Sequence, residues 1–484
     1  EWAPTVEEIN GKLHFSSRMG TIHRAVDLLK GKWEKLPQKV PGSVDSAFFA
    51  DGNRLFLYWG GGPACLHGKA SPAPIVGCEI DPKTFAAKTR PKSLFTADMA
   101  RYGWEVGGDN NDNFGRFAYL EGAHMFRRGE RYYLQYAASG TEFASYCDTA
   151  LIGPSPLGPF RRQRMNPFSY KNTGYIPSAG HGKTFADRYG NVWHITTGLL
   201  LDRNRRFVMF PVFFDADGEM WCDTAFGDWP FVVPDHKVSS PEELRTGWME
   251  LVEGKKTTAS STADGYPATA AVDGRILTYW SAATGNVGES FAVDFGGLAT
   301  VRAVQIGFSG LVRFRSFRIE AQMTDGSWRT VVDEKSHRPC AEHPYYPFEK
   351  PFQAKALRIV NTEKLANGER FALRELRAFG SMEKQKPAAP QGFRVVRDAA
   401  DRRHATVSWQ PVADARGYLI RYGISKEKMH LSRVEKGCMA EIRSLDAAEN
   451  YVWTVTAYNE AGFGAGIEPT EKLLGDYHHI NIKY

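Results

Sequence analysis

A tight turn that ends in glycine, followed by a short run of aromatic and β-branched residues, recurs through the first 235 residues of this chain. Glycine supplies the positive φ that a tight hairpin needs, and the residues after it favour extended strands. The repeats are irregularly spaced, and no long segment of helical periodicity interrupts them. The pattern predicts an all-β fold, with a β-propeller over residues 1–235 rather than a strict solenoid. The turns are Asn10-Gly11, Asp51-Gly52, Arg128-Gly129, Tyr189-Gly190 and Asp217-Gly218.

Length and composition exclude several classes of protein. With 484 residues, of which 42% are hydrophobic and 13% aromatic, the chain has material for two to four packed domains. Its net charge is only +6, and its Lys and Arg residues are scattered rather than gathered in the stripe that a nucleic-acid binder carries. The six cysteines lie far apart and form no Cys-x-x-Cys pair, which argues against a zinc site. No run of 18 apolar residues is present to span a membrane.

Three polar residues occupy equivalent positions in the repeated pattern, because each begins a strand that leads into one of the glycine turns. They are Asp45, Glu121 and His181. A propeller gathers its blades around one axis, so residues that are distant in sequence can meet at one end of its channel. A carboxylate at one fixed point of a repeated β-scaffold indicates sugar chemistry, although any one of these residues alone also fits an ordinary acid at a strand end.

The first 235 residues resemble glycoside hydrolase family 43, whose catalytic domain is a five-bladed β-propeller. The resemblance implies an inverting glycosidase in which Glu121 is the general acid and Asp45 tunes its pKa. It also implies that His181 lies at the base of the pocket near a bound calcium ion or water, and that Arg206 contacts the substrate. The matching stretches follow one another in the family's order. They are Trp2-Ala3-Pro4, Val44-Asp45-Ser46-Ala47-Phe48-Phe49-Ala50-Asp51-Gly52, Glu121-Gly122, Pro156-Leu157-Gly158-Pro159-Phe160 and Gly180-His181-Gly182.

The chemistry of an inverting glycosidase suits these residue types. The reaction needs a protonated acid for the leaving oxygen and an ionised base for water, about 6.5–9.5 Å apart. A second carboxylate near the acid raises its pKa, because two like charges resist ionising together. Glu121 with Asp45 fits this requirement. Trp59 and Trp104 are predicted to form walls on which sugar rings stack, with packing inside the blades as the alternative.

The general base is the point at which the chain departs from the family. In the resemblance the base is an Asp in a first blade ahead of the Trp-Ala-Pro segment, and this sequence starts at that segment. The expected fold is therefore a five-bladed propeller whose first blade is absent from the printed chain. Either the sequence is a fragment, or the protein lacks the base and does not hydrolyse by this route. Asp109 and Asp112 are conceivable substitutes, but their Gly/Asn/Asp-rich surroundings favour a plain loop.

Residues 250–380 contain short strands and turns, and they resemble a discoidin domain, the fold of carbohydrate-binding module family 32. The resemblance implies a structural calcium to which Asp273, in Ala-Val-Asp-Gly, contributes. Trp280 is expected in the core rather than as a sugar platform. The loop residues Tyr266, His343 and Tyr345 are better placed to contact a ligand. The sequence leaves open whether this module binds sugar or serves only as a spacer.

Residues 388–475 follow a short Pro/Ala/Lys-rich linker and resemble a fibronectin type III domain. Alternation places Val407 and Trp409 on one face of a strand, and Tyr451 fits the tyrosine corner, in which the hydroxyl bonds back to the main chain. Nothing in this segment has a catalytic pattern. We expect a spacer or packing module.

Together these features predict an exo-acting glycosidase for arabinofuranosyl, xylosyl or galactosyl linkages of plant polysaccharide. The alternative is a non-catalytic carbohydrate-binding protein on a propeller scaffold. The expected partner is an oligo- or polysaccharide, with no organic cofactor. The chain begins with Glu1 rather than Met, so we expect that an N-terminal piece was removed or omitted and that the protein is secreted, periplasmic or at the cell surface.

Overall fold

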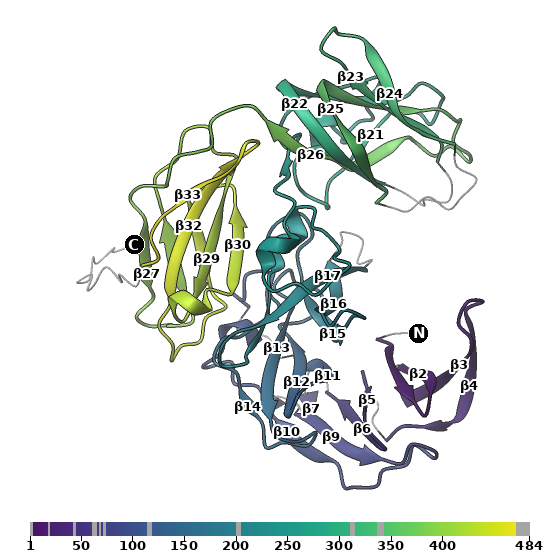
Figure 1. Cartoon of the computed structure of the whole chain (residues 1–484), viewed down its shortest axis with the longest axis vertical. Coiled ribbons are helices and arrows are strands. Elements are labelled where there is room, and N and C mark those ends of the chain that lie inside the picture. The colour runs from purple at the N-terminus through teal and green to yellow at the C-terminus, as the bar shows by residue number, and fades with distance from the viewer. Residues whose placement is uncertain are drawn as a thin grey trace.

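The structure of the chain is a computed structural model in which nearly all regular structure is β-strand (Figure 1). It describes residues 3–17, 20–41, 45–60, 65–66, 69–70, 74–113, 119–199, 205–309, 315–335 and 343–470. Trp2 and Val44 of the predicted motifs, and Cys340, lie outside the described residues. The sheets fall into three groups along the chain, and together they confirm the predicted all-β architecture.

The first group consists of four antiparallel sheets of four strands each, in chain order. The first strands of successive sheets contact one another, β1 with β5, β5 with β11 and β11 with β15, as blades of a propeller do around an axis. Two sheets contain β1 (Thr5–Ile9), β2 (Lys12–Ser17), β3 (Thr21–Asp27) and β4 (Lys32–Lys39), and β5 (Ala47–Asp51), β6 (Arg54–Trp59), β9 (Ile75–Ile80) and β10 (Lys92–Phe95). A short ribbon pairs β7 (Cys65–Leu66) with β8 (Lys69–Ala70).

The other two propeller sheets carry most of the candidate site. They contain β11 (Glu121–Arg128), β12 (Arg131–Ala138), β13 (Cys147–Gly153) and β14 (Arg161–Arg162), and β15 (Gly180–Ala186), β16 (Val192–Leu199), β17 (Arg205–Phe214) and β18 (Met220–Cys222). The 3-10 helix η2 (Gly103–Glu105) precedes them, and η3 (Thr224–Asp228) and η4 (Pro241–Leu244) follow.

The predicted hairpin turns occur where the glycines stand. Between β1 and β2, Asn10 has φ +52° and Gly11 has φ +72°. Positive φ at both central residues is the geometry of the two-residue hairpin turn that matches the twist of antiparallel strands. Asparagine tolerates this conformation better than other side chains, which explains the Asn-Gly pair.

The second group is an eight-stranded antiparallel assembly with its own hydrophobic core. Trp280 is fully buried in that core and its indole N–H donates to Ser261 O at 3.2 Å, so it packs rather than offering a sugar platform. The elements are β19 (Met249–Glu250), β20 (Lys256–Ala259), η5 (Ala268–Ala271), β21 (Trp280–Ser281), β22 (Ser290–Phe308), β23 (Phe317–Gln322), β24 (Trp328–Glu334), β25 (Tyr345–Asn361) and β26 (Ala372–Met382).

The third group is a sandwich of a three-stranded and a four-stranded sheet. Val407 and Trp409 are both buried, and the N–H of Asp446 donates to the hydroxyl of Tyr451 at 3.0 Å, which confirms the predicted tyrosine corner. The elements are β27 (Arg394–Arg397), β28 (Ala405–Ser408), β29 (Gly417–Gly423), η6 (Lys426–Lys428), β30 (Leu431–Glu435), β31 (Met439–Ile442), β32 (Val452–Asn459) and β33 (Gly462–Gly466).

The sandwich folds back against the propeller rather than extending away from it (Figure 1). One hydrophobic cluster runs from propeller residues such as Tyr136 into sandwich residues such as Tyr422. Arg101 donates two hydrogen bonds to the carboxylate of Asp446, at 3.0 and 3.1 Å, and Gly103 N bonds to Leu445 O at 2.9 Å. Of the two expected roles, the sandwich therefore has that of a packing module.

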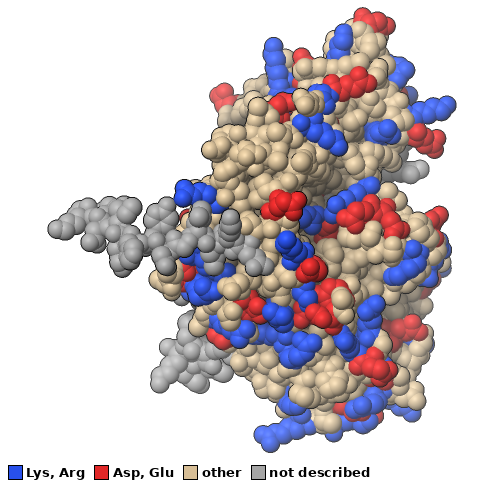
Figure 2. Space-filling model, turned by 60° about the vertical axis from the view of Figure 1, so that its left-hand side comes forward, with Lys and Arg blue, Asp and Glu red and all other residues tan. Residues whose placement is uncertain are grey.

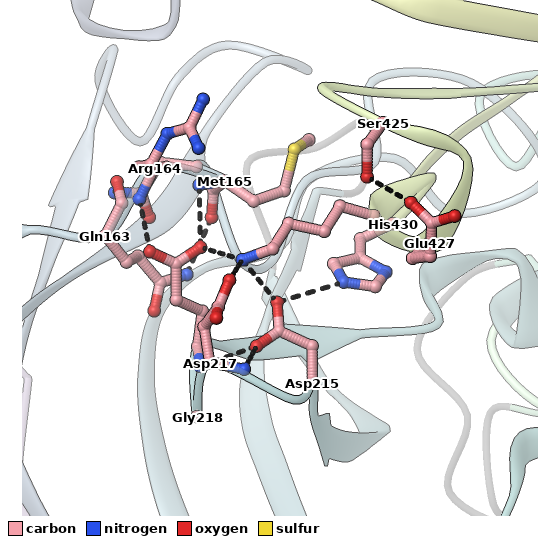
Figure 3. A network of polar contacts seen from close by, with 12 residues as sticks. Gln163, Arg164, Met165, Asp215, Asp217, Gly218, Ser425, Glu427 and His430 are labelled. Carbon is pink, nitrogen blue, oxygen red and sulfur yellow. Dashed lines mark hydrogen bonds and ion pairs between the residues drawn. The ribbon is translucent and has the colours of Figure 1, made fainter.

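A charged contact reinforces this interface. Lys428, at the end of η6, places its ammonium group 2.9 Å from Asp215, 2.8 Å from Asp217 and 2.9 Å from Glu219. Figure 3 shows that Asp215 and Asp217 converge on it from the propeller side, and that Asp215 also faces His430 at 3.5 Å. We call Lys428 with Asp215, Asp217 and Glu219 the Lys428 cluster. It joins the sandwich to the β17–β18 turn of the last propeller sheet.

The surface agrees with the charge pattern of the sequence. Figure 2 shows positive and negative side chains mixed over one face of the molecule, without a stripe of one sign. Within the described residues, no helix reaches the length and apolar character that a membrane crossing requires. Cys78, Cys147, Cys222 and Cys438 are free thiols.

Candidate active site

Glu121 is the first residue of β11, at a break in the register of the β11–β12 hairpin. It pairs with Ala137, and pairing then resumes at His124 with Gln135. Gly122 has φ +58° inside this irregularity. Bulges of this kind bend a strand and redirect a side chain, and they are common beside active sites. The glycine after Glu121 is therefore part of the geometry that aims the carboxylate.

Two other polar side chains meet the Glu121 carboxylate. The hydroxyl of Tyr146, just before β13, donates to Glu121 Oε1 and lies 3.3 Å from Nδ1 of His181 on β15. Glu121 is 7% exposed, and Tyr146 is fully buried. We call Glu121, Tyr146 and His181 the Glu121 cluster. It brings together residues of two neighbouring blades, as predicted for Glu121 and His181.

Burial raises the pKa of Glu121, and the negative charge of Asp45 raises it further, while His181, the Tyr146 hydrogen bond and Arg205 act in the opposite direction. The raised pKa favours the protonated carboxyl toward neutral pH. A protonated carboxyl beside a buried hydroxyl can donate to a leaving oxygen, which is the task of a general acid.

Asp45 lies just before β5 and has φ +49°, a left-handed conformation that aspartate adopts more readily than most residues. It is partly exposed, whereas Glu121 is buried. Its charge reaches Glu121 from the neighbouring blade. The structure thus brings Asp45 into electrostatic contact with the predicted acid.

His181 and Gly122 require each other's shape. A Cβ atom on Gly122 would lie 2.7 Å from two carbon atoms of the His181 ring, closer than such atoms approach. His181 itself has φ +56°. The ring therefore lies directly on the backbone of Gly122, beside the carboxylate that precedes it. Any larger residue at 122 would push the imidazole away.

Asp148 holds His181 in this position, and the sequence interpretation missed it. Its fully buried carboxylate accepts hydrogen bonds from His181 N at 3.0 Å and Gly182 N at 2.7 Å. Nε2 of His194 lies 2.8 Å from its second oxygen, and Nδ1 of His194 lies 3.0 Å from Thr184 Oγ1. Buried carboxylates persist where hydrogen bonds satisfy them. The available signal was a single acid in Cys147–Gly153, a strand without other charges.

Arg205, rather than Arg206, acts electrostatically on the cluster. The charge of Arg205 opposes the rise in the pKa of Glu121. Arg206 is the next residue along β17, and successive strand residues point to opposite faces. The pKa of His343 in the second module is lowered to about 4, chiefly by burial and then by the charge of Arg206. The predicted substrate contact at Arg206 is thus directed toward the second module.

The two predicted stacking walls differ. Trp104 is fully buried in the cluster shared with the sandwich, which corrects the expectation that it stacks on sugar, because no face of the ring is open. Trp59 is partly exposed and packs against the core of the second sheet. A Cβ on the adjacent Gly60 would lie 3.2 Å from Glu121 Cα, so the end of β6 abuts the candidate acid.

The remaining sequence candidates have local or interface positions. Asp109 accepts a hydrogen bond from Ala144 N at 2.9 Å, and Asp112 is exposed, as in a plain loop. Tyr266 stacks on Tyr279 with ring centroids 4.6 Å apart. His343 lies against Gly307, which also approaches Tyr175 of the propeller, so it faces a module contact. Tyr345 is 41% exposed.

Asp273 lies among oxygen atoms that fit a calcium ion. Thr278 Oγ1 is 2.9 and 2.7 Å from its two carboxylate oxygens and 3.1 Å from Arg275 O. Burial and then the charge of Glu250 raise the pKa of the nearby Glu375, and Asp273 adds to the rise. Glu375 Oε2 is buried without a partner. Calcium takes such hard oxygen donors. No group of three or more His, Cys, Asp or Glu side chains suited to a metal occurs in the described part of the chain, at His181 or elsewhere.

Solved structures resemble the chain in parts. One described as a glycoside hydrolase is 19% identical and covers 78% of this chain and 84% of its own, with a TM-score of 0.45. A thermostable family-43 glycoside hydrolase is 18% identical, covers 50% of this chain and 77% of its own, and has a TM-score of 0.39. Chitosan-binding module 1 of a chitosanase/glucanase from Paenibacillus sp. IK-5 is 25% identical, covers 27% of this chain and 99% of the module, and has a TM-score of 0.25. No curated protein matches the chain.

Three family models match successive parts of the sequence. Residues 1–220 match glycosyl hydrolases family 43, residues 256–376 match the F5/8 type C domain, and residues 388–472 match the fibronectin type III domain. These matches are in the predicted order. Residues 1–220 therefore belong to glycosyl hydrolases family 43, and the protein is a glycosidase whose catalytic domain is followed by an F5/8 type C domain and a fibronectin type III domain.

Proposed function

We propose that the protein hydrolyses arabinofuranosyl, xylosyl or galactosyl linkages of plant polysaccharide with inversion at the anomeric carbon. The observation that carries the proposal is the Glu121 cluster, in which a buried carboxyl of raised pKa bonds to a buried tyrosine hydroxyl. Glu121 donates its proton to the leaving oxygen. Asp45 raises the pKa of that acid through like-charge repulsion.

An inverting reaction also needs an ionised carboxylate to activate water, about 6.5–9.5 Å from the acid. The family resemblance assigns this base to an aspartate ahead of the Trp-Ala-Pro segment, and Asp45 keeps the tuning role. The decisive experiments therefore use the full-length protein. The substrate is an oligo- or polysaccharide, and we place the protein outside the cytoplasm, where such polysaccharides occur.

The acid assignment is tested with Glu121→Gln on a natural linkage. Loss of general-acid catalysis lowers rates by about 10²–10⁴-fold, so kcat/KM should fall by that factor while sugar binding is retained. Glu130→Gln is the matched control, because Glu130 lies in the turn of the same hairpin with its side chain 96% exposed. A glycoside with an activated leaving group needs less protonation, and the variant should lose less activity on it.

Full activity of Glu121→Gln on the natural linkage would remove Glu121 from the mechanism. The stereochemistry has its own test, because proton NMR of the first product distinguishes the two anomers before mutarotation. Inversion agrees with a single displacement by water, whereas retention requires a covalent intermediate and would overturn the inverting mechanism.

We also propose that calcium binds at Asp273 and stabilises the F5/8 type C domain. Support comes from the oxygen donors around Thr278 and the unpartnered oxygen of Glu375. A cation bound only by the folded state raises its stability by mass action. Chelation should lower the melting temperature of the parent protein and leave that of Asp273→Asn unchanged. Equal responses of the two proteins would exclude a site at Asp273.

A further inference from the structure

A cavity of about 280 Å³ lies where the three parts of the molecule meet, away from the Glu121 cluster. Its walls come from the connector after β18, from the start of the F5/8 type C domain and from the four-stranded sheet of the fibronectin type III domain. Ligand pockets in proteins begin at about 300 Å³ and pair an apolar lining with a few convergent polar groups. The cavity has the size for one sugar ring.

The polar side of the cavity carries excess positive charge. Asp223 is 1% exposed, and its Oδ2 accepts hydrogen bonds from Arg245 Nη2 at 2.7 Å and Arg421 Nη2 at 3.4 Å. Two guanidinium groups thus face one carboxylate. Each guanidinium has five N–H donors in a planar fork that matches a carboxylate. The longer Arg421 contact leaves donors of that fork for a ligand.

Asp223 has accepting capacity left as well. Its other oxygen, Oδ1, is buried and has no hydrogen-bond partner among the described residues. A buried carboxylate oxygen without a donor is costly, and hydroxyl groups of a ligand are suitable donors. The polar side can therefore both donate to an anion and accept from hydroxyl groups.

The apolar side of the cavity is aromatic. Trp229 is partly exposed and is held edge-on by Phe463, with ring centroids 5.2 Å apart, and by Tyr458, at 5.4 Å. Trp248, also partly exposed, lines the cavity from the F5/8 type C side. Aromatic rings held in this way offer rigid apolar surface at low entropic cost. A ligand ring with one apolar face and polar edges fits between these walls.

We propose that this cavity binds a uronic acid residue of an acidic saccharide, with the sugar carboxylate on Arg421 and Arg245 and the ring face on Trp229. The charge selects an acid over a neutral sugar, because a neutral ring would leave the net positive charge without a counterion. The site is separate from the proposed catalysis and does not depend on it. It would hold acidic polysaccharide on the enzyme at the junction of its domains.

The test uses the full-length protein with Glu121→Gln, so that turnover does not consume the ligand. Galacturonic acid, an oligogalacturonide and a neutral galacto-oligosaccharide of the same length are titrated separately by calorimetry. We expect saturable 1:1 binding of the acidic ligands and at least tenfold weaker binding of the neutral one. Binding of the oligosaccharide without the free acid would place the recognised unit inside a longer chain and still support the site.

Arg421→Gln and Trp229→Ala should each weaken binding of the acidic ligand about tenfold or more, the range of a charged hydrogen bond or an aromatic anchor. Arg394→Gln is the matched control, because Arg394 lies on the opposite sheet of the same sandwich. Arg421→Lys keeps the charge but loses the fork, so it should bind with intermediate affinity and serves if Arg421→Gln fails to fold. Absence of saturable binding to the parent, or unchanged affinity in the folded Arg421 and Trp229 variants, would overturn the proposal.

Discussion

The Glu121 cluster and the Lys428 cluster both bury carboxylates in the propeller, but they differ in what lies opposite the negative charge. Glu121 faces a neutral tyrosine hydroxyl, and burial raises its pKa. Asp215 faces the ammonium group of Lys428 at 2.9 Å. Burial also acts to raise the pKa of Asp215, but hydrogen bonds from His430 and Lys428 outweigh it and lower that pKa.

The difference shows that burial alone does not decide whether a carboxylate in this protein is charged. A cation in direct contact holds Asp215 ionised and makes it part of a bond between domains. Without such a contact, Glu121 keeps its proton toward neutral pH and can give it up in a reaction. One fold thus uses similar acids for adhesion and for chemistry, and variants can separate the two uses.

Removing the cation should have the largest effect. Lys428→Met leaves Asp215, Asp217 and Glu219 without their shared partner, and breaking a buried ion pair from one side costs about 3–5 kcal/mol. The free energy of unfolding, measured by urea denaturation, should fall by that amount, with earlier loss of the sandwich from the propeller.

Lys426→Met is the matched control, because Lys426 lies on the same 3-10 helix and is exposed. It should change the free energy of unfolding by less than about 0.5 kcal/mol, as exposed positions usually do. Equal stability of the two variants would mean that the Lys428 cluster does not hold the sandwich, and the comparison would fail.

Neutralising one acid in each cluster should have smaller and unequal effects. Asp215→Asn loses charged hydrogen bonds worth about 1.5–3 kcal/mol, whereas Glu121→Gln imitates a carboxyl that is already protonated and should leave stability unchanged or higher. Urea denaturation at pH 7 of both variants gives the comparison. A larger stability loss for Glu121→Gln would show that Glu121 is ionised in the folded protein.

The pH dependence of the same pair has opposite signs. The folded-state pKa of Asp215 is lowered, so its stabilisation is present above the ordinary carboxyl pKa and is lost as pH falls. The folded-state pKa of Glu121 is raised, so its protonated form favours folding at low pH and that contribution is lost as pH rises. Each substitution should remove the corresponding limb of the stability profile.

Local patterns in the sequence were enough to predict much of the fold. The Asn10-Gly11 turn and the Tyr451 corner depend on neighbours a few residues away, and both occur as expected. Glu121 and His181 stand at strand starts that the glycine turns mark, and they meet because a propeller brings strand starts together.

The missed features depend on contacts between distant segments. Lys428 belongs to a Lys-Glu-Lys stretch typical of solvated surface, and its acidic partner Glu219 is 209 residues away. Trp104 was a plausible sugar platform until the sandwich packed over it. Asp148 showed as an isolated acid in a strand, and only the fold reveals that it anchors the His181 backbone. Domain packing, rather than strand pattern, decides these positions.

Removing the distant charge on the acid should have the smallest effect. Asp45→Asn deletes one contribution that raises the pKa of Glu121 and leaves burial, which is the largest, in place. The alkaline limb of the kcat/KM profile reports the acid in the free enzyme, so it should move to lower pH. The acidic limb belongs to the base and should stay. A shift of the alkaline limb to higher pH, or none, would mean that Asp45 does not tune Glu121, and the raised pKa of the acid would then rest on burial alone.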